Sequence, residues 1–358
     1  MLDSIIFDLQ RSGGISRYWY ELLSNLIRHR PDWRLVLWAN PNADNPLLRQ
    51  LREQGSGSDA VEVHALYPSL LARYRAARID RSFGDIALFH SSYYRLAAPS
   101  LPSVTTVHDF TYERFGTRMQ AWVHHRQKAA AVRGSRQIIC VSEATRRDLL
   151  NFFPDVPAES CHVVHHGRSP VFHERRSPDS RYGEAPYALF VGQRGSYKNF
   201  HLAVEAVVAS EGLQLFIAGG GTLSVEEQAL LERRLPNRHR HFNRVNDDEL
   251  RELYQGALAL TYLSSYEGFG LPPLEAMACG CPVIAMNTSS IPEVVGDAAL
   301  LLDSAEVHPV LEALSAVRDP ERRHRMISAG LKQAARFSWD RAVEETLAVY
   351  ERAVRTRE

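Results

Sequence analysis

Short apolar runs alternate with helical patterns along the whole chain, and this alternation predicts βαβ units with parallel sheets. In the first half, the expected strands are Leu35–Trp38, Ile86–Phe89, Ser103–Val107, Gln137–Val141 and His162–His165. In the second half, they are Tyr187–Val191, Leu213–Ala218, Leu258–Leu263, Pro282–Ala285 and Ala299–Leu302. The helical patterns between them include Ser16–Arg28, Gln120–Arg133, Asn199–Ser210, Asp247–Gln255 and Pro272–Cys279. The order of these elements predicts an α/β fold.

A polar segment without periodicity separates the two halves of the chain. Residues 169–186 include Pro170 and Pro178, and we interpret them as an interdomain linker. We therefore expect an N-terminal domain over residues 1–168 and a C-terminal domain over residues 187–338, both doubly wound. Residues 339–358 predict an amphipathic helix that packs back on the N-terminal domain. Two such domains would face each other across a central cleft at the carboxyl ends of their strands.

Composition narrows the class of protein. The 358 residues include 42 basic and 42 acidic side chains and are 45% hydrophobic, which excludes a disordered chain and an overtly basic nucleic-acid binder. The chain lacks both an apolar run of membrane-spanning length and the pattern of a signal peptide. Four cysteines are too few for a disulfide framework, so we expect a cytoplasmic location. The charge is uneven, however: residues 1–168 hold 21 basic and 16 acidic side chains, and residues 169–358 hold 21 and 26.

The most informative stretch runs from Leu260 to Ala285. An expected strand ends there in a loop with two glycines, Gly268 and Gly270, and a helix follows. Glycines allow a ligand to approach the backbone, and a helix start attracts anions, so a phosphate is the expected guest. Glu267 on the loop and Glu275 in the helix suit a ligand that also carries hydroxyl groups. A tight turn followed by a favourable N-terminal helix charge is the alternative interpretation.

Further candidates follow two other expected strands. Arg194 and Lys198 come after the run Tyr187–Val191 and precede a helix, where solvated cations are unfavourable and a bound phosphate would be favourable. An ordinary solvated basic pair is the alternative. His108 comes directly after Ser103–Val107, at the carboxyl edge of the sheet, where a lone histidine is otherwise structural or solvated.

The stretch SSYEGFGLPPLEAMACGCPVI, in which seven residues separate Glu267 from Glu275, resembles the signature of glycosyltransferase family 4. Its members are retaining enzymes of the GT-B type with two Rossmann-like domains. The resemblance covers nearly the whole chain, because residues 107–110, 141–145, 165–167, 191–199 and 289–294 also match family motifs in the expected order. The opening residues 7–18 resemble members that build bacterial surface polysaccharides, such as O-antigen mannosyltransferases.

The resemblance implies transfer of a hexose from a nucleotide diphosphate sugar, of the GDP-mannose type, to a hydroxyl of a glycan or lipid-linked glycan. It implies front-face attack without a metal or other cofactor. The catalytic residues that it implies are His108, Arg194, Lys198 and Glu267. The donor-binding residues that it implies are Gly13, Gly14, Gly192, Val245, Gly268, Phe269, Gly270, Leu271 and Glu275. Arg17 and Asp109 are the acceptor candidates.

Other functions stay open at this point. One is a non-catalytic scaffold that binds a sugar nucleotide, and another is a GT-B epimerase or phosphorylase, although no lysine stands in a pyridoxal-phosphate context. Cys279 and Cys281 have no second pair to complete a zinc site, so we expect no metal. Basic residues in Tyr67–Arg81 and in 114–136 favour peripheral contact with an anionic inner membrane, or else form ordinary solvated helix faces. We expect no nucleic-acid partner.

Overall fold

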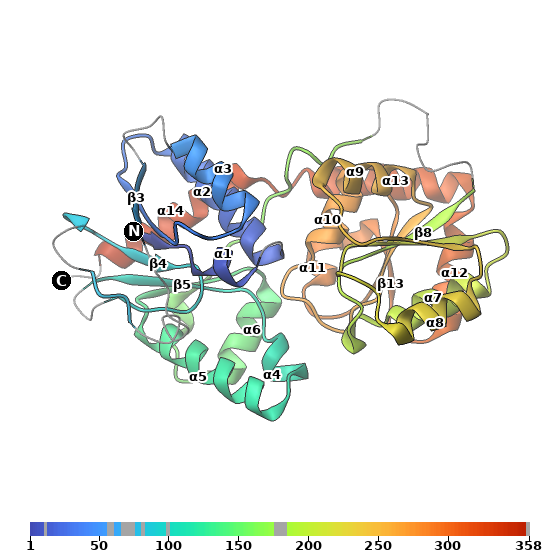
Figure 1. The fold of residues 1–358 in the computed structure, drawn as a ribbon, viewed down its shortest axis with the longest axis horizontal. Helices are drawn as coiled ribbons and strands as arrows, with labels where there is room; N and C mark the ends of the chain where they lie inside the picture. Colours follow the sequence, from blue (N-terminus) through green and yellow to red (C-terminus); the bar gives the residue numbers. More distant parts are fainter. Residues whose placement is uncertain are drawn as a thin grey trace. The chain divides into compact units, whose positions relative to one another are not determined.

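A computed structural model describes residues 1–10, 13–55, 61–65, 76–79, 83–97, 101–174 and 185–355. The chain forms two compact units (Figure 1). The first unit comprises Met1–Gly167 together with Ser338–Glu358, and the second comprises Arg168–Phe337. The second unit thus begins at the last residue that the sequence analysis assigned to the N-terminal domain. Most of the expected linker, residues 175–184, lies outside the described residues.

In the first unit, the described residues form a seven-stranded parallel sheet in the order β3-β2-β1-β4-β5-β6-β7. Its strands are β1 (Leu2–Asp3), β2 (Leu35–Ala39), β3 (Val61–Ala65), β4 (Phe89–Ser91), β5 (Ser103–Val107), β6 (Gln137–Cys140) and β7 (Cys161–Val163). Its helices are α1 (Ile5–Leu9), α2 (Gly14–His29), α3 (Pro46–Gly55), α4 (Thr111–Phe115), α5 (Arg118–Gly134), α6 (Glu143–Phe152) and α14 (Trp339–Arg355). The strand order reverses between β1 and β4, which defines the switch point of a doubly wound sheet.

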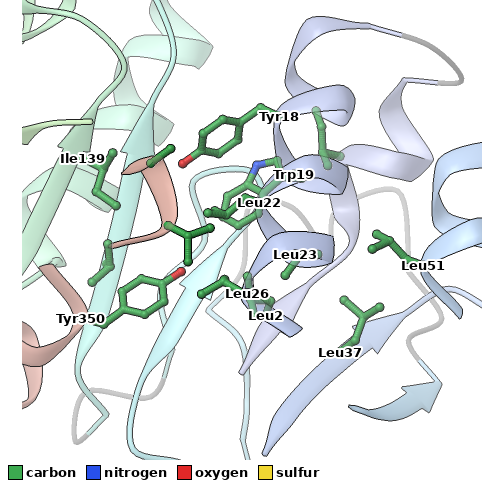
Figure 2. Close-up of a cluster of buried hydrophobic side chains, with 14 of the residues drawn as sticks. Leu2, Tyr18, Trp19, Leu22, Leu23, Leu26, Leu37, Leu51, Ile139 and Tyr350 are labelled. Atoms are coloured by element: carbon green, nitrogen blue, oxygen red, sulfur yellow. The ribbon is translucent and has the colours of Figure 1, made fainter. Parts of the chain in front are cut away.

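Two helices from opposite ends of the chain close the core of this unit. On α2, Tyr18, Trp19 and Leu22 lie on one buried face, and they share a hydrophobic cluster with Val343 and Tyr350 of α14. Figure 2 shows Tyr18, Trp19 and Tyr350 in this cluster. Each such buried side chain stabilises the fold by about 1.5–3 kcal/mol. The last helix is therefore part of the first unit, although the second unit precedes it in the chain.

In the second unit, the described residues form a six-stranded parallel sheet in the order β10-β9-β8-β11-β12-β13. Its strands are β8 (Tyr187–Val191), β9 (Gln214–Ala218), β10 (His239–Phe242), β11 (Ala259–Tyr262), β12 (Val283–Met286) and β13 (Leu300–Leu302). Its α-helices are α7 (Phe200–Val208), α8 (Val225–Arg234), α9 (Asp247–Gly256), α10 (Leu271–Ala278), α11 (Ile291–Val295), α12 (Val307–Val317) and α13 (Pro320–Ala334). Helices cover both faces of the sheet (Figure 1). The order reverses between β8 and β11.

The two parallel sheets with their helices confirm the predicted α/β class. The expected bounds of β5 and β8 are correct, but the expected strand Ile86–Phe89 is displaced, because β4 is the segment Phe89–Ser91 that pairs with β5. Three strands were not predicted. β1 has only two residues, β3 alternates with polar side chains, and β10 (HRHF) is polar at three of four positions. Most of the basic stretch Tyr67–Arg81 lies outside the described residues.

Candidate active site

The loops after β8 and β11 meet at the switch point of the second unit, where open α/β sheets bind their ligands. Asn199 joins them. Its side-chain amide donates to the carbonyl oxygen of Leu263 (2.8 Å) and to Oγ of Ser265 (2.9 Å). In the opposite direction, the Ser265 N–H donates to the carbonyl oxygen of Tyr197 at 2.7 Å. These bonds hold the two loops in a fixed relation.

Lys198 and Glu267 form an ion pair across this junction. The Lys198 ammonium donates to Oε1 of Glu267, and the two side chains are 14% and 15% exposed. The ammonium also lies 5.2 Å from the ring centre of Tyr197 and 5.5 Å from that of Tyr262. Burial and the neighbouring Glu267 carboxylate raise the pKa of Tyr262 well above its ordinary value. A cation and a carboxylate, both still in contact with solvent, thus stand where a ligand is expected.

The loop that carries Glu267 is fixed by the two serines that precede α11. The Glu267 N–H donates to Oγ of Ser289 (2.9 Å), and Oγ of Ser290 donates to the carbonyl oxygens of Glu267 (3.0 Å) and Phe269 (2.7 Å). Gly270 then adopts φ +113°, a value that favours glycine, and α10 begins at the next residue, Leu271. The predicted site residues of this loop therefore belong to one rigid segment.

The start of α10 offers fewer N–H donors than the sequence analysis assumed. Pro272 and Pro273 occupy the first turn and have no N–H group, and the Leu274 N–H already donates to the carbonyl oxygen of Gly270 (3.4 Å). The first turn of this helix is thus a poor phosphate cradle, and Lys198 is left as the main source of positive charge at the junction.

Glu275 lies on α10, half-buried, and a fully buried tyrosine of α9 fixes its carboxylate. The Tyr254 hydroxyl donates to Oε2 of Glu275 at 3.1 Å. Burial and the Glu275 carboxylate raise the pKa of Tyr254 well above its ordinary value, so that its hydroxyl stays protonated as a donor. This arrangement suits a carboxylate that accepts hydrogen bonds from a ligand's hydroxyl groups.

Arg194, a predicted catalytic residue, is bound into a different loop. Its guanidinium donates to the carbonyl oxygens of Gly219 (3.1 Å), Gly220 (3.3 Å), Gly221 (3.2 Å) and Thr222 (3.0 Å). Its Nε lies 3.0 Å from a Glu227 oxygen, and its side chain is only 3% exposed. In this structure, Arg194 therefore stabilises the glycine turn after β9.

Three further donor-binding candidates lie in the second unit. Gly192 adopts φ +106° directly after β8, in a conformation that other residues rarely adopt. Gly268 is a buried part of the Glu267 loop. Val245 is half-buried between β10 and α9, and its neighbour Asn243 donates to Oγ1 of Thr222 at 3.4 Å. Asn243, two residues before Val245, thus contacts Thr222, whose carbonyl oxygen also accepts a hydrogen bond from Arg194.

His108 belongs to the first unit and comes directly after β5. The residue is 7% exposed, and its Nε2 atom has no hydrogen-bond partner in the part of the chain that the structure describes. The ring of Tyr18 packs edge-on against it, with ring centres 4.9 Å apart. Burial, above all, lowers the pKa of His108 to about 4, with Lys128 also lowering it and Asp109 raising it. The imidazole is therefore neutral near pH 7 and carries an unused polar atom.

Lys128 is a buried cation beside this histidine, and its sequence context gave no sign of this burial. Its ammonium donates to the carbonyl oxygen of Asp109 at 2.7 Å and pairs with Glu113 at 2.8 Å, and both of the paired side chains are 3% exposed. Lys128 belongs to the basic segment 114–136, for which the sequence predicts a membrane-facing or solvated helix face, and its burial shows that this prediction is wrong for Lys128. The side chain of Asp109 accepts the N–H of Thr111 at 3.0 Å, so that it shapes the turn before α4.

The glycines at the start of α2 and the acceptor candidate Arg17 lie in the first turn of that helix. Gly13 is extended (φ 172°) and Gly14 begins α2. Oγ of Ser16 donates to the carbonyl oxygen of Gly13 at 2.9 Å, which closes the first turn. Arg17 lies 3.7 Å from Glu21 in a pair one turn apart on this helix.

The switch point of the first unit is occupied by the protein's own side chains. Asp3, at the end of β1, is fully buried and accepts hydrogen bonds from Ser91 Oγ (3.0 Å), from the Ser92 N–H (2.9 Å) and from Ser92 Oγ (2.9 Å). Arg95, also buried, approaches the same carboxylate at 3.5 Å. The comparable place in the second unit holds the Lys198–Glu267 pair, so the second unit has the more accessible charged site.

A cavity of about 530 Å³ in the first unit lies at the amino ends of the strands. Its walls include Leu2, Leu35 and Leu88, where β1, β2 and β4 begin, together with Trp33 and Tyr350. His108, in contrast, follows the carboxyl end of β5. Because ligands of doubly wound sheets bind at the carboxyl ends of the strands, we do not assign this cavity to the candidate site.

Within the described ranges, no three His, Cys, Asp or Glu side chains gather in a way that would hold a metal ion. All four cysteines are buried with free thiols. Nor does any helix in those ranges have the length and apolar character needed to cross a membrane.

Comparisons with known proteins assign each unit separately. The model of "Glycosyltransferase Family 4" matches residues 12–170, and that of "Glycosyl transferases group 1" matches residues 172–333. The "O-antigen chain mannosyltransferase B" of Escherichia coli is 29% identical, over 94% of this chain and 95% of that protein.

Solved structures resemble the whole fold. Sucrose-phosphate synthase from Thermosynechococcus elongatus has a TM-score of 0.76 at 18% identity and covers 99% of this chain and 98% of its own. HepE of Anabaena in complex with UDP-glucose has a TM-score of 0.73 at 17% identity, with coverages of 94% and 96%. These likenesses confirm the GT-B fold.

Proposed function

Since this chain belongs to glycosyltransferase family 4, we propose that it transfers a hexose from a nucleotide diphosphate sugar to a hydroxyl of a glycan or lipid-linked glycan, with retention at the anomeric carbon. The observation that carries the proposal is the Lys198–Glu267 pair at the switch point of the second unit, in which Glu267 lies on the same loop-and-helix segment as Glu275. A cation for a diphosphate and two carboxylates for hydroxyl groups match the chemistry of such a donor.

Lys198 is the group that we assign to the leaving diphosphate. When the anomeric carbon–oxygen bond breaks, negative charge grows on the departing phosphate oxygen, and a fixed ammonium stabilises it. The acceptor hydroxyl attacks from the same face, and its proton passes to that phosphate oxygen. Electrons from the broken bond stay on the diphosphate, so the step needs no covalent enzyme intermediate.

The two glutamates divide the remaining donor contacts. We assign Glu267 to the sugar hydroxyls, because its loop is fixed by Ser289 and Ser290 beside Lys198. We assign Glu275 to the ribose hydroxyls, with Tyr254 orienting its carboxylate. The two oxygens of each carboxylate can accept the paired hydroxyls of a sugar ring.

His108 and Asp109 are the contributions that we assign to the first unit. With its pKa lowered to about 4, His108 is neutral at physiological pH and can exchange hydrogen bonds with a sugar hydroxyl through Nε2. We assign Asp109 and Arg17 to the acceptor. For Arg194, we propose that it shapes the glycine turn near the diphosphate, and that a direct phosphate contact requires its release from that turn.

We propose a mannose-type donor and a role in the synthesis of a bacterial surface polysaccharide, on the strength of the Escherichia coli relative. The solved structure of HepE with UDP-glucose makes a uridine donor the competing possibility. A thermal-shift titration with GDP, UDP, GDP-mannose and UDP-glucose separates the two. Stabilisation by the guanosine compounds alone supports the proposal, and stabilisation by the uridine compounds alone contradicts it.

We propose that transfer needs no metal ion, because Lys198 can supply the positive charge that a divalent cation supplies to the diphosphate in other enzymes. The test is turnover in excess EDTA. Turnover that persists supports the proposal, and turnover that Mg²⁺ or Mn²⁺ restores after chelation contradicts it.

We also propose contact with an anionic membrane surface through the exposed face of α4 and α5. Large apolar side chains gather on these two helices: Tyr112 is 44% exposed, Phe115 46%, Met119 70% and Trp122 57%. Helix α5 carries basic residues but no Asp or Glu. Aromatic and apolar groups beside arginines suit the headgroup region of a bilayer with negative charge.

Only some of the basic residues of segment 114–136 are available to contact a membrane. Lys128 is buried, while Arg114 pairs with Asp148 and Arg133 with Asp155. Arg118 and Arg126, next to Met119 and Trp122 on α5, make no ion pair with another described residue.

Flotation with vesicles of phosphatidylcholine and phosphatidylglycerol tests this surface. We expect the wild type to float with the anionic vesicles at low salt and Met119→Glu/Trp122→Glu to remain in the soluble fraction. Val225→Glu is the matched control, since Val225 is 82% exposed on the second unit. Absence of flotation for the wild type, or equal flotation for the double variant, contradicts the proposal.

A further inference from the structure

A single ammonium group on α5 holds the segment that follows β5. Lys128 reaches the carbonyl oxygen of Asp109 (2.7 Å) and the carboxylate of Glu113 (2.8 Å), and it lies 4.1 Å above the ring centre of Phe110. These three partners lie within five consecutive residues that directly follow His108. The Lys128 and Glu113 side chains are each 3% exposed, so water competes little for these contacts.

The segment needs such an external support. Helix α4 has only five residues, and Phe110 at its N-terminal boundary gives no side-chain cap to the helix. The Asp109 side chain holds one N–H, that of Thr111. A short helix with little capping is marginal by itself. The buried ion pair from α5 is therefore a main constraint on the direction in which the backbone leaves β5.

We propose that Lys128 is a positioning residue for transfer, which fixes the turn His108–Phe110 so that His108 and Asp109 keep the orientation that the reaction needs. This inference rests on the proposed function, in which His108 contacts the donor sugar. The ammonium of Lys128 is already engaged by the Asp109 carbonyl oxygen and the Glu113 carboxylate. It acts through the Asp109 carbonyl and through Glu113.

The electrostatics of the site agree with the geometry. The groups that face His108 are Asp109, Lys128 and the imidazoles of His90 and His166, with the ring of Tyr18 packed against it. The Lys128 charge lowers the pKa of His108, and the Asp109 charge raises it. Lys128 thus opposes protonation of His108 while it holds the neighbouring peptide in place.

The test compares two ion pairs whose cations, Lys128 and Arg133, both lie on α5. In Glu113→Gln/Lys128→Met, both buried charges are removed together, so that neither is left unpaired in the interior. The matched control is Arg133→Met/Asp155→Asn, which removes a pair whose side chains are 52% and 54% exposed. Lys128→Arg is the conservative rescue, because an arginine can still donate to the Asp109 carbonyl oxygen and to Glu113.

For the buried double variant, we expect kcat to fall about 100-fold, because small misplacements of reacting groups have effects of that size. Its KM for the donor, which the second unit binds, should change less than about two-fold. Lys128→Arg should recover part of kcat, and amide exchange at residues 108–111 should be faster in the double variant. The control should keep both constants within about two-fold of wild type.

The outcomes separate the inference from the function on which it rests. A wild type that transfers no sugar overturns the proposed function, and amide exchange at 108–111 still reports whether Lys128 holds the turn. An active wild type overturns the inference if the buried double variant, folded at the assay temperature, keeps its kcat. A loss expressed in donor KM alone overturns it as well.

Discussion

Lys198 donates a hydrogen bond to the carboxylate of Glu267, and this pair joins the loop after β8 to the loop after β11 at the point where the strand order reverses. The two residues are far apart in the chain, and only the topology of the sheet brings them together. The pair is partly exposed and its loops are fixed by Asn199, Ser289 and Ser290. It is thus a preorganised charge pair that is mostly buried and still reached by solvent.

Lys198→Ala should remove transfer while the protein stays folded. Because the lysine is the cation that we assign to the developing phosphate charge, we expect kcat to fall at least about 100-fold. Steady-state assays of nucleotide release measure this effect. Lys332→Ala, on α13, is the control, and equal turnover in Lys198→Ala and wild type would refute the assignment of Lys198 to the diphosphate.

Glu275→Ala should weaken binding of the nucleotide sugar. Loss of a carboxylate that accepts hydroxyl hydrogen bonds should reduce affinity by about 1.5–3 kcal/mol, which isothermal titration calorimetry detects. Tyr254→Phe should have a smaller effect in the same direction, since it removes only the bond that orients Glu275. Glu312→Ala, 69% exposed on α12, is the control. Wild-type affinity in Glu275→Ala would exclude the ribose role.

Asp3→Ala should destabilise the first unit without affecting the donor site. The substitution leaves Ser91, Ser92 and the buried Arg95 without their acceptor, and such losses amount to about 3–5 kcal/mol. Urea unfolding followed by tryptophan fluorescence is suitable, because Trp19 and Trp38 belong to this unit. The account fails if the free energy of unfolding is unchanged, or if nucleotide affinity falls as well.

Stability should fall as the pH decreases from 6.5 to about 4. Burial lowers the pKa of His108 to about 4 from its ordinary 6.5, and it lowers those of His90 and His166 as well. Below pH 6.5, these histidines are therefore protonated in the unfolded chain while they stay neutral in the folded chain. The contribution of these neutral histidines to the free energy of unfolding is fully present above pH 6.5. Below that pH, it falls by up to about 1.4 kcal/mol per pH unit for each histidine.

Urea unfolding at pH 7.5, 6.5 and 5.5 measures this slope. His108→Gln should reduce the loss between pH 6.5 and 5.5, and His308→Gln, whose side chain is 77% exposed, should not. Identical slopes in wild type and His108→Gln would show that His108 is protonated in the native state at these pH values.

Much of the fold follows from local pattern. Tyr187–Val191 (YALFV) is a continuous apolar run, and Ser103–Val107 (SVTTV) is rich in β-branched residues, so β5 and β8 were predicted with correct bounds. The same reasoning placed His108 and Lys198 after strands. β1 and β10 could not be predicted in this way. β1 has only two residues, which are too few to show a periodic pattern, and β10 (HRHF) is mostly polar, unlike a typical buried strand.

The site could be predicted only as far as it depends on the order of strands. The Lys198–Glu267 pair follows from two loops at one switch point. The partners of Arg194 depend instead on the path of the turn Gly219–Thr222, and the burial of Lys128 depends on how α4 packs against α5. Arginines and lysines are usually exposed, so the basic residues of 114–136 were expected on the surface. Arg194 was assigned to a ligand because it lies before a helix and in a motif that resembles the family's phosphate loop.

The most direct test of the central claim is nucleotide release by the purified protein from a panel of nucleotide diphosphate sugars, with and without a lipid-linked glycan acceptor. We predict acceptor-dependent release with at least one donor of the panel, an anomeric configuration in the product that matches the donor, and loss of release in Lys198→Ala. Turnover that Lys198→Ala retains, or a product with inverted configuration, would contradict the account.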